Sequence, residues 1–273
     1  MNFKQIELSR FGAREHVAVV TLMRPDKMNA LTKVMEAELR EAFAQLDRDD
    51  SVRVIVLTGN GRAFCAGMDI DELEVLPPDD ISEMAWMRAY DMNRRADYQS
   101  RYSYFPGVRK PVISAINGAA AGLGLVLALY SDMRFASETA VFSTAFAKRG
   151  LIAEHGIAWL LPRIVGPGHA ADLLLSSRKV TAQEALSMGL VERLFSPDSL
   201  LEHTLTYAEE LALNVSPRSA RVIKQQLGES PFQTLTQSIA QANREMFLSI
   251  QSDDFKEGVA HFIERRPARF SGT

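Results

Sequence analysis

Apolar and polar positions alternate near the start of the chain and then change to a helical spacing. Residues 5–10 and 17–22 alternate, which predicts two paired strands on either side of a turn at Gly12. From Ala30 to Asp47 the apolar residues return every three or four positions, as they do on one face of an amphipathic helix. The N-terminal part is therefore predicted to form two strands and a helix.

A repeat of strands and helices follows. The mostly apolar, β-like runs over 52–57 and 112–116 predict strands. A helix is expected over 122–130, followed by short strands over 133–136 and 140–142. The repeated order of strand, strand and helix fits a right-handed spiral of ββα turns better than a regular βαβ sheet. We therefore expect a spiral α/β fold.

Two stretches depart from this repeat. Between Leu73 and Pro106 the sequence is polar and rich in methionine, which predicts a mobile loop and then an amphipathic helix from Ile81 to about Ser103. After about residue 196 the spacing is helical throughout, and these apolar faces need a partner, either the core or another subunit. The predicted helices span Leu200–Leu213, Pro217–Leu227, Phe232–Ile250 and Phe255–Arg265. Residues 1–196 are accordingly expected to form a core and 197–273 a C-terminal helical region.

Composition narrows the classes of function. The chain has 273 residues, 47% hydrophobic and 24% charged, which is ordinary for a globular protein. A net charge of −3 argues against a nucleic-acid or polybasic membrane surface, and no apolar run approaches the ~18 residues that span a membrane. Cys65, the only cysteine, suits a reducing compartment and small apolar filling. The start lacks the order of a signal peptide, so we expect a cytoplasmic protein without nucleic-acid or membrane partners.

Two short glycine-bearing segments are the main candidates for chemistry. Phe64–Asp69 and Asn117–Gly124 each follow a predicted strand and open into a predicted helix. The start of a helix has N–H groups without intrahelical partners. Two such donors converging on one point would make an oxyanion hole for a carbonyl that becomes an enolate or a tetrahedral anion. Taken singly, each segment is better explained by an ordinary turn or a packed helix.

The pair of segments resembles the crotonase (enoyl-CoA hydratase/isomerase) superfamily. The matching patterns are F-C-A-G-x-D at 64–69, N-G-x-A-x-G-x-G at 117–124 and, earlier, R-P-x-x-x-N-A-L at 24–31. Residues 150–166 and 254–267 also look like family segments. The resemblance implies a ββα spiral core, an acyl-CoA thioester substrate, and C-terminal helices that join protomers into trimers or hexamers. It implies no permanently bound cofactor, because coenzyme A enters as part of the substrate.

Site residues carry over from the family by motif. The oxyanion-hole donors would be the main-chain N–H groups of Met68 and Leu123, whose side chains are free to vary. For Asp69, capping of a helix start is favoured over catalysis. The segments implied to lie along coenzyme A contribute Lys27, Met28, Ala30, Ala66, Asp69 and Ile70. Lys27 is equally compatible with a solvated surface lysine.

Two acids of the hydratases are missing. The hydratases of this family resemble one another in two glutamates, and the matching positions here are Val126 and Phe146. Adding water across a conjugated double bond needs a base for the water and an acid for carbon 2. Neither side chain can serve, so a two-glutamate hydratase is disfavoured.

A carboxylate stands instead at Glu154, in the segment Gly150–Gly156. This segment resembles the Δ3,Δ2-enoyl-CoA isomerases of the peroxisomal type, in which that glutamate is the catalytic base. An apolar helix from Ile157 to Leu161 follows, and burial beside it would raise the pKa of the carboxyl. The helix N-terminus opposes this shift, and the alternative is an acid that only satisfies the helix dipole.

The leading hypothesis is an enzyme that converts 3-enoyl-CoA to 2-enoyl-CoA, with Glu154 moving the proton and an oxyanion hole stabilising the enolate. A hydratase or hydrolase using water activated by Glu154 is an alternative within enzymes. A crotonase-fold protein that binds acyl-CoA without turnover is a third reading. The histidines are scattered without ligand spacing, so no metal site is predicted.

Overall fold

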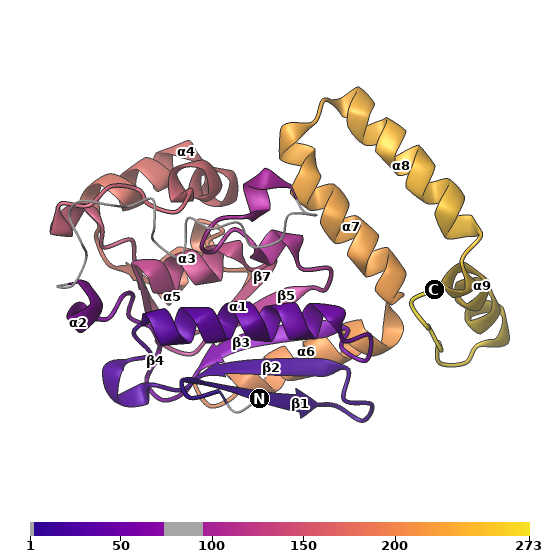
Figure 1. The fold of residues 1–273 in the computed structure, drawn as a ribbon, viewed down its shortest axis with the longest axis horizontal. Coiled ribbons are helices and arrows are strands. Elements are labelled where there is room, and N and C mark those ends of the chain that lie inside the picture. The colour runs from indigo at the N-terminus through magenta and orange to yellow at the C-terminus, as the bar shows by residue number, and fades with distance from the viewer. Residues whose placement is uncertain (1–2, 74–94) are drawn as a thin grey trace.

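The computed structural model describes residues 3–73 and 95–273, which form two β-sheets packed with helices (Figure 1). In the larger sheet only the first two strands pair antiparallel, and every other pair is parallel. Its strands, in spatial order, are β1 (Ile6–Phe11), β2 (Val17–Leu22), β3 (Val54–Gly59), β5 (Val112–Ile116), β7 (Met133–Ser137) and β10 (Arg193–Phe195). The smaller sheet consists of β4 (Ala63–Cys65), β6 (Ala119–Ala121), β8 (Val141–Ser143) and β9 (Val180–Thr181).

The predicted repeat of strand, strand and helix is confirmed. Each of β3, β5 and β7 belongs to the larger sheet and is followed by a strand of the smaller one and then by a helix. The helices up to this point are α1 (Lys33–Arg48), α2 (Ile70–Leu73), α3 (Leu123–Tyr130), α4 (Ile157–Ser176) and α5 (Ala182–Ser187). Short 3-10 helices lie at Pro25–Lys27, Ala96–Tyr98, Phe105–Gly107, Ala147–Arg149 and Ser230–Phe232. The chain therefore winds as a spiral of ββα turns.

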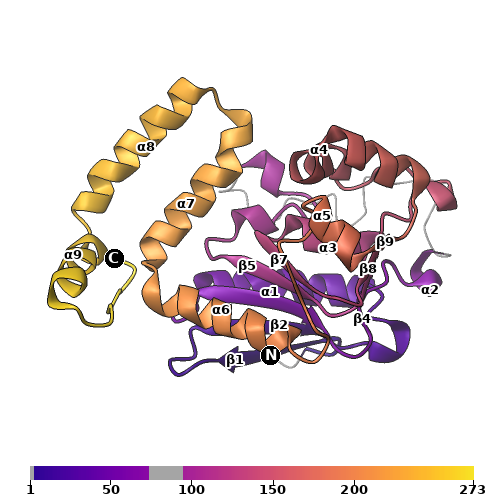
Figure 2. The ribbon, with the colours of Figure 1, turned by 180° about the vertical axis from the view of Figure 1, so that it is seen from behind.

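Both faces of the central strands β3 and β5 are buried, as expected of parallel strands. In β3, Ile55 and Leu57 belong to the main core between the sheet, α1 and α3. Val54 and Val56 point the other way and pack with α6 (Leu200–Asn214), which lies in front of the sheet in Figure 2. This burial on both faces explains why the strand reads as a continuous apolar run.

The last three helices extend to one side of the spiral (Figures 1 and 2). They are α7 (Pro217–Glu229), α8 (Leu235–Ile250) and α9 (Asp253–Glu264). Capping explains their starts: Thr234 and Gln237 form a capping box before α8, and the Ser252 side chain accepts from the N–H of Phe255. Large apolar side chains on these helices are exposed, among them Leu235, Ile239, Met246, Phe247, Phe255, Val259, Phe262 and Ile263. The predicted helical C-terminal region is confirmed.

The helix predicted over residues 81–103 is wrong in the part that the structure describes, residues 95–103. The expectation over Ile81–Ser103 lies outside the described residues up to position 94. Residues 95–103 form the 3-10 helix Ala96–Tyr98 and turns. The N–H of Ser100 donates to the Ser103 hydroxyl, a local bond that favours a turn over a helix.

No helix in residues 3–73 and 95–273 is long and apolar enough to cross a membrane. The 20-residue α4 is the longest described helix, and it contains Pro162 and Pro167 and is interrupted at Gly166, where φ is 79°. A proline removes a helical hydrogen bond and favours such a break.

Candidate active site

The two glycine-bearing segments meet at one edge of the smaller sheet. Strands β4 and β6 pair parallel, with Ala63 opposite Ala119 and Cys65 opposite Ala120, so the segments that follow them emerge side by side. The first turn of α3 packs directly on β4, because a methyl group at Gly124 would lie only 2.1 Å from the carbonyl oxygen of Cys65. Only glycine permits this approach of helix to strand.

Met68 is held by a short parallel pairing with Leu31. The N–H of Leu31 donates to Gly67 O at 2.7 Å, and the N–H of Asp69 donates to Leu31 O at 2.8 Å. In a parallel pair this pattern leaves the N–H of Met68 on the side away from Leu31. The pairing therefore directs that donor out of the local ladder.

Leu123 is the residue predicted to supply the second donor. It is the first residue of α3, where an N–H has no intrahelical acceptor. A methyl group at Gly67 would lie 3.7 Å from the nitrogen of Leu123, so the backbones of the two segments are neighbours. No acceptor for the N–H of Met68 or Leu123 is found within residues 3–73 and 95–273. The arrangement leaves two donors free for a ligand.

The N-terminal motif lies alongside the first glycine segment because of Asn29. This residue is fully buried with φ at 54°, and its side-chain nitrogen donates to Asn60 O and Ala63 O at 2.9 and 2.8 Å. The N–H of Ala66 donates to Met28 O at 3.0 Å. The sequence showed Asn29 only as one letter of a motif, and its role in joining these segments was missed.

Asp69 is buried between the same segments. Its carboxylate lies 2.7 Å from the guanidinium of Arg24 and accepts from the N–H of Asp71 at 3.1 Å, in the first turn of α2. The hydrogen bond from Arg24 holds the pKa of this carboxyl below its ordinary value. These contacts support the capping interpretation, with an ion pair added.

The other residues implied along coenzyme A surround this pairing. Ala30 is buried, and its carbonyl accepts from Arg24 Nη1 at 2.6 Å. Met28 and Ala66 are half-buried. Ile70 and Lys27 are exposed, and Lys27 Nζ lies 3.7 Å from the Asp71 carboxylate, an exposed pair of the kind that contributes about 0–1 kcal/mol.

Glu154 lies in the turn that precedes α4. The helix begins only at Ile157, whose N–H donates to the main-chain oxygen of Glu154 at 3.1 Å. Burial raises the pKa of the Glu154 carboxyl, and the positive charge of Arg101 partly offsets this. Within the described part of the chain no α4 N–H donates to this carboxylate, so it does not cap the helix.

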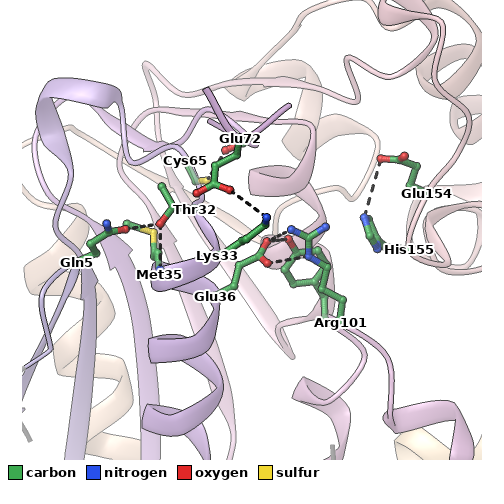
Figure 3. A network of polar contacts seen from close by, with 12 residues as sticks. Gln5, Thr32, Lys33, Met35, Glu36, Cys65, Glu72, Arg101, Glu154 and His155 are labelled. Carbon is green, nitrogen blue, oxygen red and sulfur yellow. Dashed lines mark hydrogen bonds and ion pairs between the residues drawn. The ribbon is translucent and has the colours of Figure 1, made fainter. Parts of the chain in front are cut away.

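Arg101 is fixed by a buried network that the sequence did not indicate (Figure 3). Its guanidinium forms two hydrogen bonds with the carboxylate of Glu36 in α1, one of them at 2.9 Å. The Tyr102 hydroxyl donates to the same carboxylate at 2.5 Å. Partners so far apart in sequence leave no local pattern, so only the fold identifies them.

The positions of the two missing glutamates are apolar and buried. Val126 lies one turn into α3, and Phe146 precedes the 3-10 helix Ala147–Arg149; they are 1% and 5% exposed. Neither can exchange a proton. Cys65 is fully buried, and burial raises the pKa of its thiol to about 12, so it is a poor nucleophile.

A cavity of about 690 Å³ adjoins the turn that carries Glu154, just before α4. His155 and Gly156 form part of its wall, and residues of the C-terminal region, including Phe232, form another part. Trp159 of α4 stacks on Phe232 at 5.3 Å between ring centroids. Among the described residues, no three histidine, cysteine, aspartate or glutamate side chains gather in a way that could hold a metal ion.

Comparison with known proteins gives a consistent result. The model of the enoyl-CoA hydratase/isomerase family matches residues 12–273. The 1,2-epoxyphenylacetyl-CoA isomerase of Escherichia coli K12 is 33% identical over 256 residues, covering 94% of this chain and 95% of that protein. An enoyl-CoA hydratase of Alternaria alternata is 33% identical over 258 residues, covering 94% of this chain and 83% of its own length.

Solved structures agree. The crystal structure of an enoyl-CoA hydratase from Bacillus anthracis superposes with a TM-score of 0.87 at 27% identity, over 99% of this chain and all of that one (100%). The resemblance seen in the sequence motifs is thus confirmed along nearly the whole chain. This chain belongs to the enoyl-CoA hydratase/isomerase family of the crotonase superfamily, a family of acyl-CoA enzymes.

Proposed function

We propose that this enzyme moves a double bond within an acyl-CoA thioester, converting 3-enoyl-CoA to 2-enoyl-CoA. The observation that carries the proposal is a partly buried carboxylate, Glu154, in a site where the two hydratase positions are Val126 and Phe146. A 1,3-proton shift needs one group that takes a proton and returns it. Hydration by the two-glutamate route needs two.

The proposed mechanism begins with the thioester oxygen between the N–H groups of Met68 and Leu123. These donors stabilise the negative charge that develops on the oxygen and so acidify carbon 2. Glu154 removes a proton from carbon 2, which gives a dienolate. The protonated Glu154 then returns this proton to carbon 4, and the double bond lies between carbons 2 and 3.

Coenzyme A is proposed to lie along the paired segments 28–31 and 66–69. The main-chain groups of Met28, Ala30 and Ala66 are fixed there by hydrogen bonds, and Asp69 is fixed by its ion pair with Arg24. Exposed Lys27 and Ile70 would contact the outer part of the coenzyme. The coenzyme is thus a part of the substrate and not a resident group.

A second candidate reaction is hydration or hydrolysis with water activated by Glu154. It is favoured by the similarity to the Alternaria enoyl-CoA hydratase. One carboxylate would then serve first as base for water and later as acid.

Absorbance of the conjugated thioester separates these reactions. Purified protein receives a 3-enoyl-CoA and, separately, a 2-enoyl-CoA. Absorbance that rises with the first and holds with the second supports isomerisation. Falling absorbance with the second indicates hydration and contradicts the inference from Val126 and Phe146.

The pH dependence should report the environment of Glu154. Its carboxyl must be ionised to take a proton, and its pKa is raised above the ordinary value of 4.5. Activity is therefore expected to fall, as pH is lowered, with a midpoint above 4.5. A profile of kcat/KM against pH measures this midpoint in the free enzyme. A midpoint at or below that value would contradict Glu154 as the base.

The exposed apolar faces of α8 and α9 are proposed to join protomers into a homotrimer or homohexamer. Phe262 and Ile263 are 79% and 72% exposed, and patches of this kind mark protein contacts. Phe262→Asp should therefore lower the mass measured by light scattering, because it places a charge in the contact. Val34→Asp, at an exposed position of α1, is the control. A wild-type monomer, or an unchanged mass of the variant, would refute the assembly.

A further inference from the structure

His155 occupies an unusual backbone position directly after Glu154. Its φ is 53° and that of Gly156 is 75°, so two consecutive residues adopt the left-handed conformation. This conformation is unfavourable for a residue with a side chain. The Tyr130 hydroxyl donates to His155 O at 2.7 Å, and a methyl group at Gly156 would come within 2.9 Å of that same hydroxyl oxygen. This hydrogen bond therefore holds the turn against α3. Glycine is needed at position 156 because a side chain there would clash with the Tyr130 hydroxyl.

The imidazole of His155 is also fixed in position, by packing against Tyr102. It meets the buried ring of Tyr102 edge to face, with 5.0 Å between ring centroids and an interplanar angle of 79°. The Tyr102 ring is fixed in turn by its hydrogen bond to Glu36. Only 17% of the His155 side chain is exposed, so its direction is set by packing and not by solvent.

This direction brings the imidazole to the candidate base. Nε2 of His155 lies 3.9 Å from Oε2 of Glu154. Figure 3 shows the two side chains pointing toward each other. Burial and the charge of Arg101 lower the pKa of His155 to about 4, so the ring is neutral at neutral pH and the contact is not an ion pair. At that separation the two groups are also slightly too far apart for a hydrogen bond.

We propose that His155 is a positioning residue for Glu154, whose neutral imidazole donates from Nε2 to the carboxylate and fixes its direction during proton transfer. This inference rests on the proposed role of Glu154 as the base. A cation at this place would stabilise the carboxylate and weaken it as a base, whereas a neutral donor orients it with less loss of basicity. The proposal requires Nε2 and Oε2 to approach from 3.9 Å to hydrogen-bond distance during proton transfer.

Two substitutions isolate the donor. His155→Phe keeps a ring against Tyr102 but has no N–H, and His155→Gln places an amide N–H near the position of Nε2. Both residues are less suited than histidine to positive φ, so the backbone cost is common to them. His155→Phe should lower kcat by about 10–100-fold with little change in KM, the loss typical of removing an orienting partner, while His155→Gln keeps most of kcat.

The pH dependence of kcat separates the donor role from a packing role, because a loss of packing alone would not shift the midpoint of the acid limb. Without the donor the ionised carboxylate is less stabilised, so the acid limb of kcat should shift to higher pH in His155→Phe and stay in place in His155→Gln. The charged and titratable groups that face the imidazole, namely Arg101, Tyr102 and Glu154, are the same in both variants. An unshifted limb and an unchanged kcat in His155→Phe would overturn the proposal, as would an equal loss in both variants.

Further variants keep the result interpretable. If His155→Phe does not fold, Tyr130→Phe replaces it, because it releases the His155 carbonyl and should also lower kcat with KM unchanged; full kcat would overturn the proposal. Glu154→Gln is measured beside them. If Glu154→Gln remains active, the proposed function itself fails. If it is inactive while His155→Phe behaves as wild type, only the inference about His155 fails.

Discussion

Glu154→Gln is expected to lower kcat by about 10²–10⁴-fold, the contribution of a positioned general base, and to leave the fold intact. Glutamine has the shape of glutamate but takes no proton at neutral pH, so the step at carbon 2 loses its base. Glu154 forms no ion pair with a described lysine or arginine and caps no helix in the described part of the chain. Thermal unfolding should therefore change little. The measurement is the rate of conjugated-thioester formation from 3-enoyl-CoA.

Glu138→Gln is the matched control. Glu138 is exposed in the turn after β7, and its substitution by glutamine removes the same single negative charge. It should retain the wild-type rate. Binding of the CoA thioester, measured by calorimetry, should persist in Glu154→Gln, since the residues proposed along the coenzyme are untouched. Turnover of Glu154→Gln at the Glu138→Gln rate would show that Glu154 is not the base.

The fold was predictable because its patterns are local. The strands predicted over 17–22 and 112–116 have the same bounds as β2 and β5. Burial on both faces, by the core and by α6, makes such runs continuous and easy to recognise. Helix starts were less accurate: α9 begins at Asp253 and not at Phe255, because the Ser252 hydroxyl caps it.

Only those parts of the candidate site that lie within a recognisable sequence motif could be predicted. Glycines at 67 and 124 mark close approaches of backbone, and such positions are visible in a sequence as a choice of residue. The Arg101–Glu36 network near Glu154 is not visible in the sequence as a characteristic choice of residue. Arg101 and Glu36 are far apart along the chain, and their pairing depends on how α1 packs against the segment before β5. Electrostatic partners of this kind follow from the fold.

The second large effect concerns a main-chain group. Leu123→Pro removes one proposed oxyanion-hole donor, and loss of one such donor typically lowers kcat by about 10²–10³-fold. Proline is tolerated at the first position of a helix, where its missing N–H has no intrahelical acceptor. Leu123 is that position in α3, and the residue before it is Gly122, which has no Cβ to clash with the proline ring. The backbone of α3 should therefore survive the change.

Leu123→Ala is the control that separates the N–H from the side chain. Leu123 is buried, so both variants lose packing, and a buried Leu→Ala change costs about 2–5 kcal/mol of stability. Only the proline variant also loses the donor. Rates are compared at a temperature at which circular dichroism shows both variants folded. We expect Leu123→Ala to keep most of kcat and Leu123→Pro to lose it, because the enolate oxygen then retains a single N–H, that of Met68. Equal rates in the two variants would mean that the charge on the thioester oxygen is stabilised elsewhere.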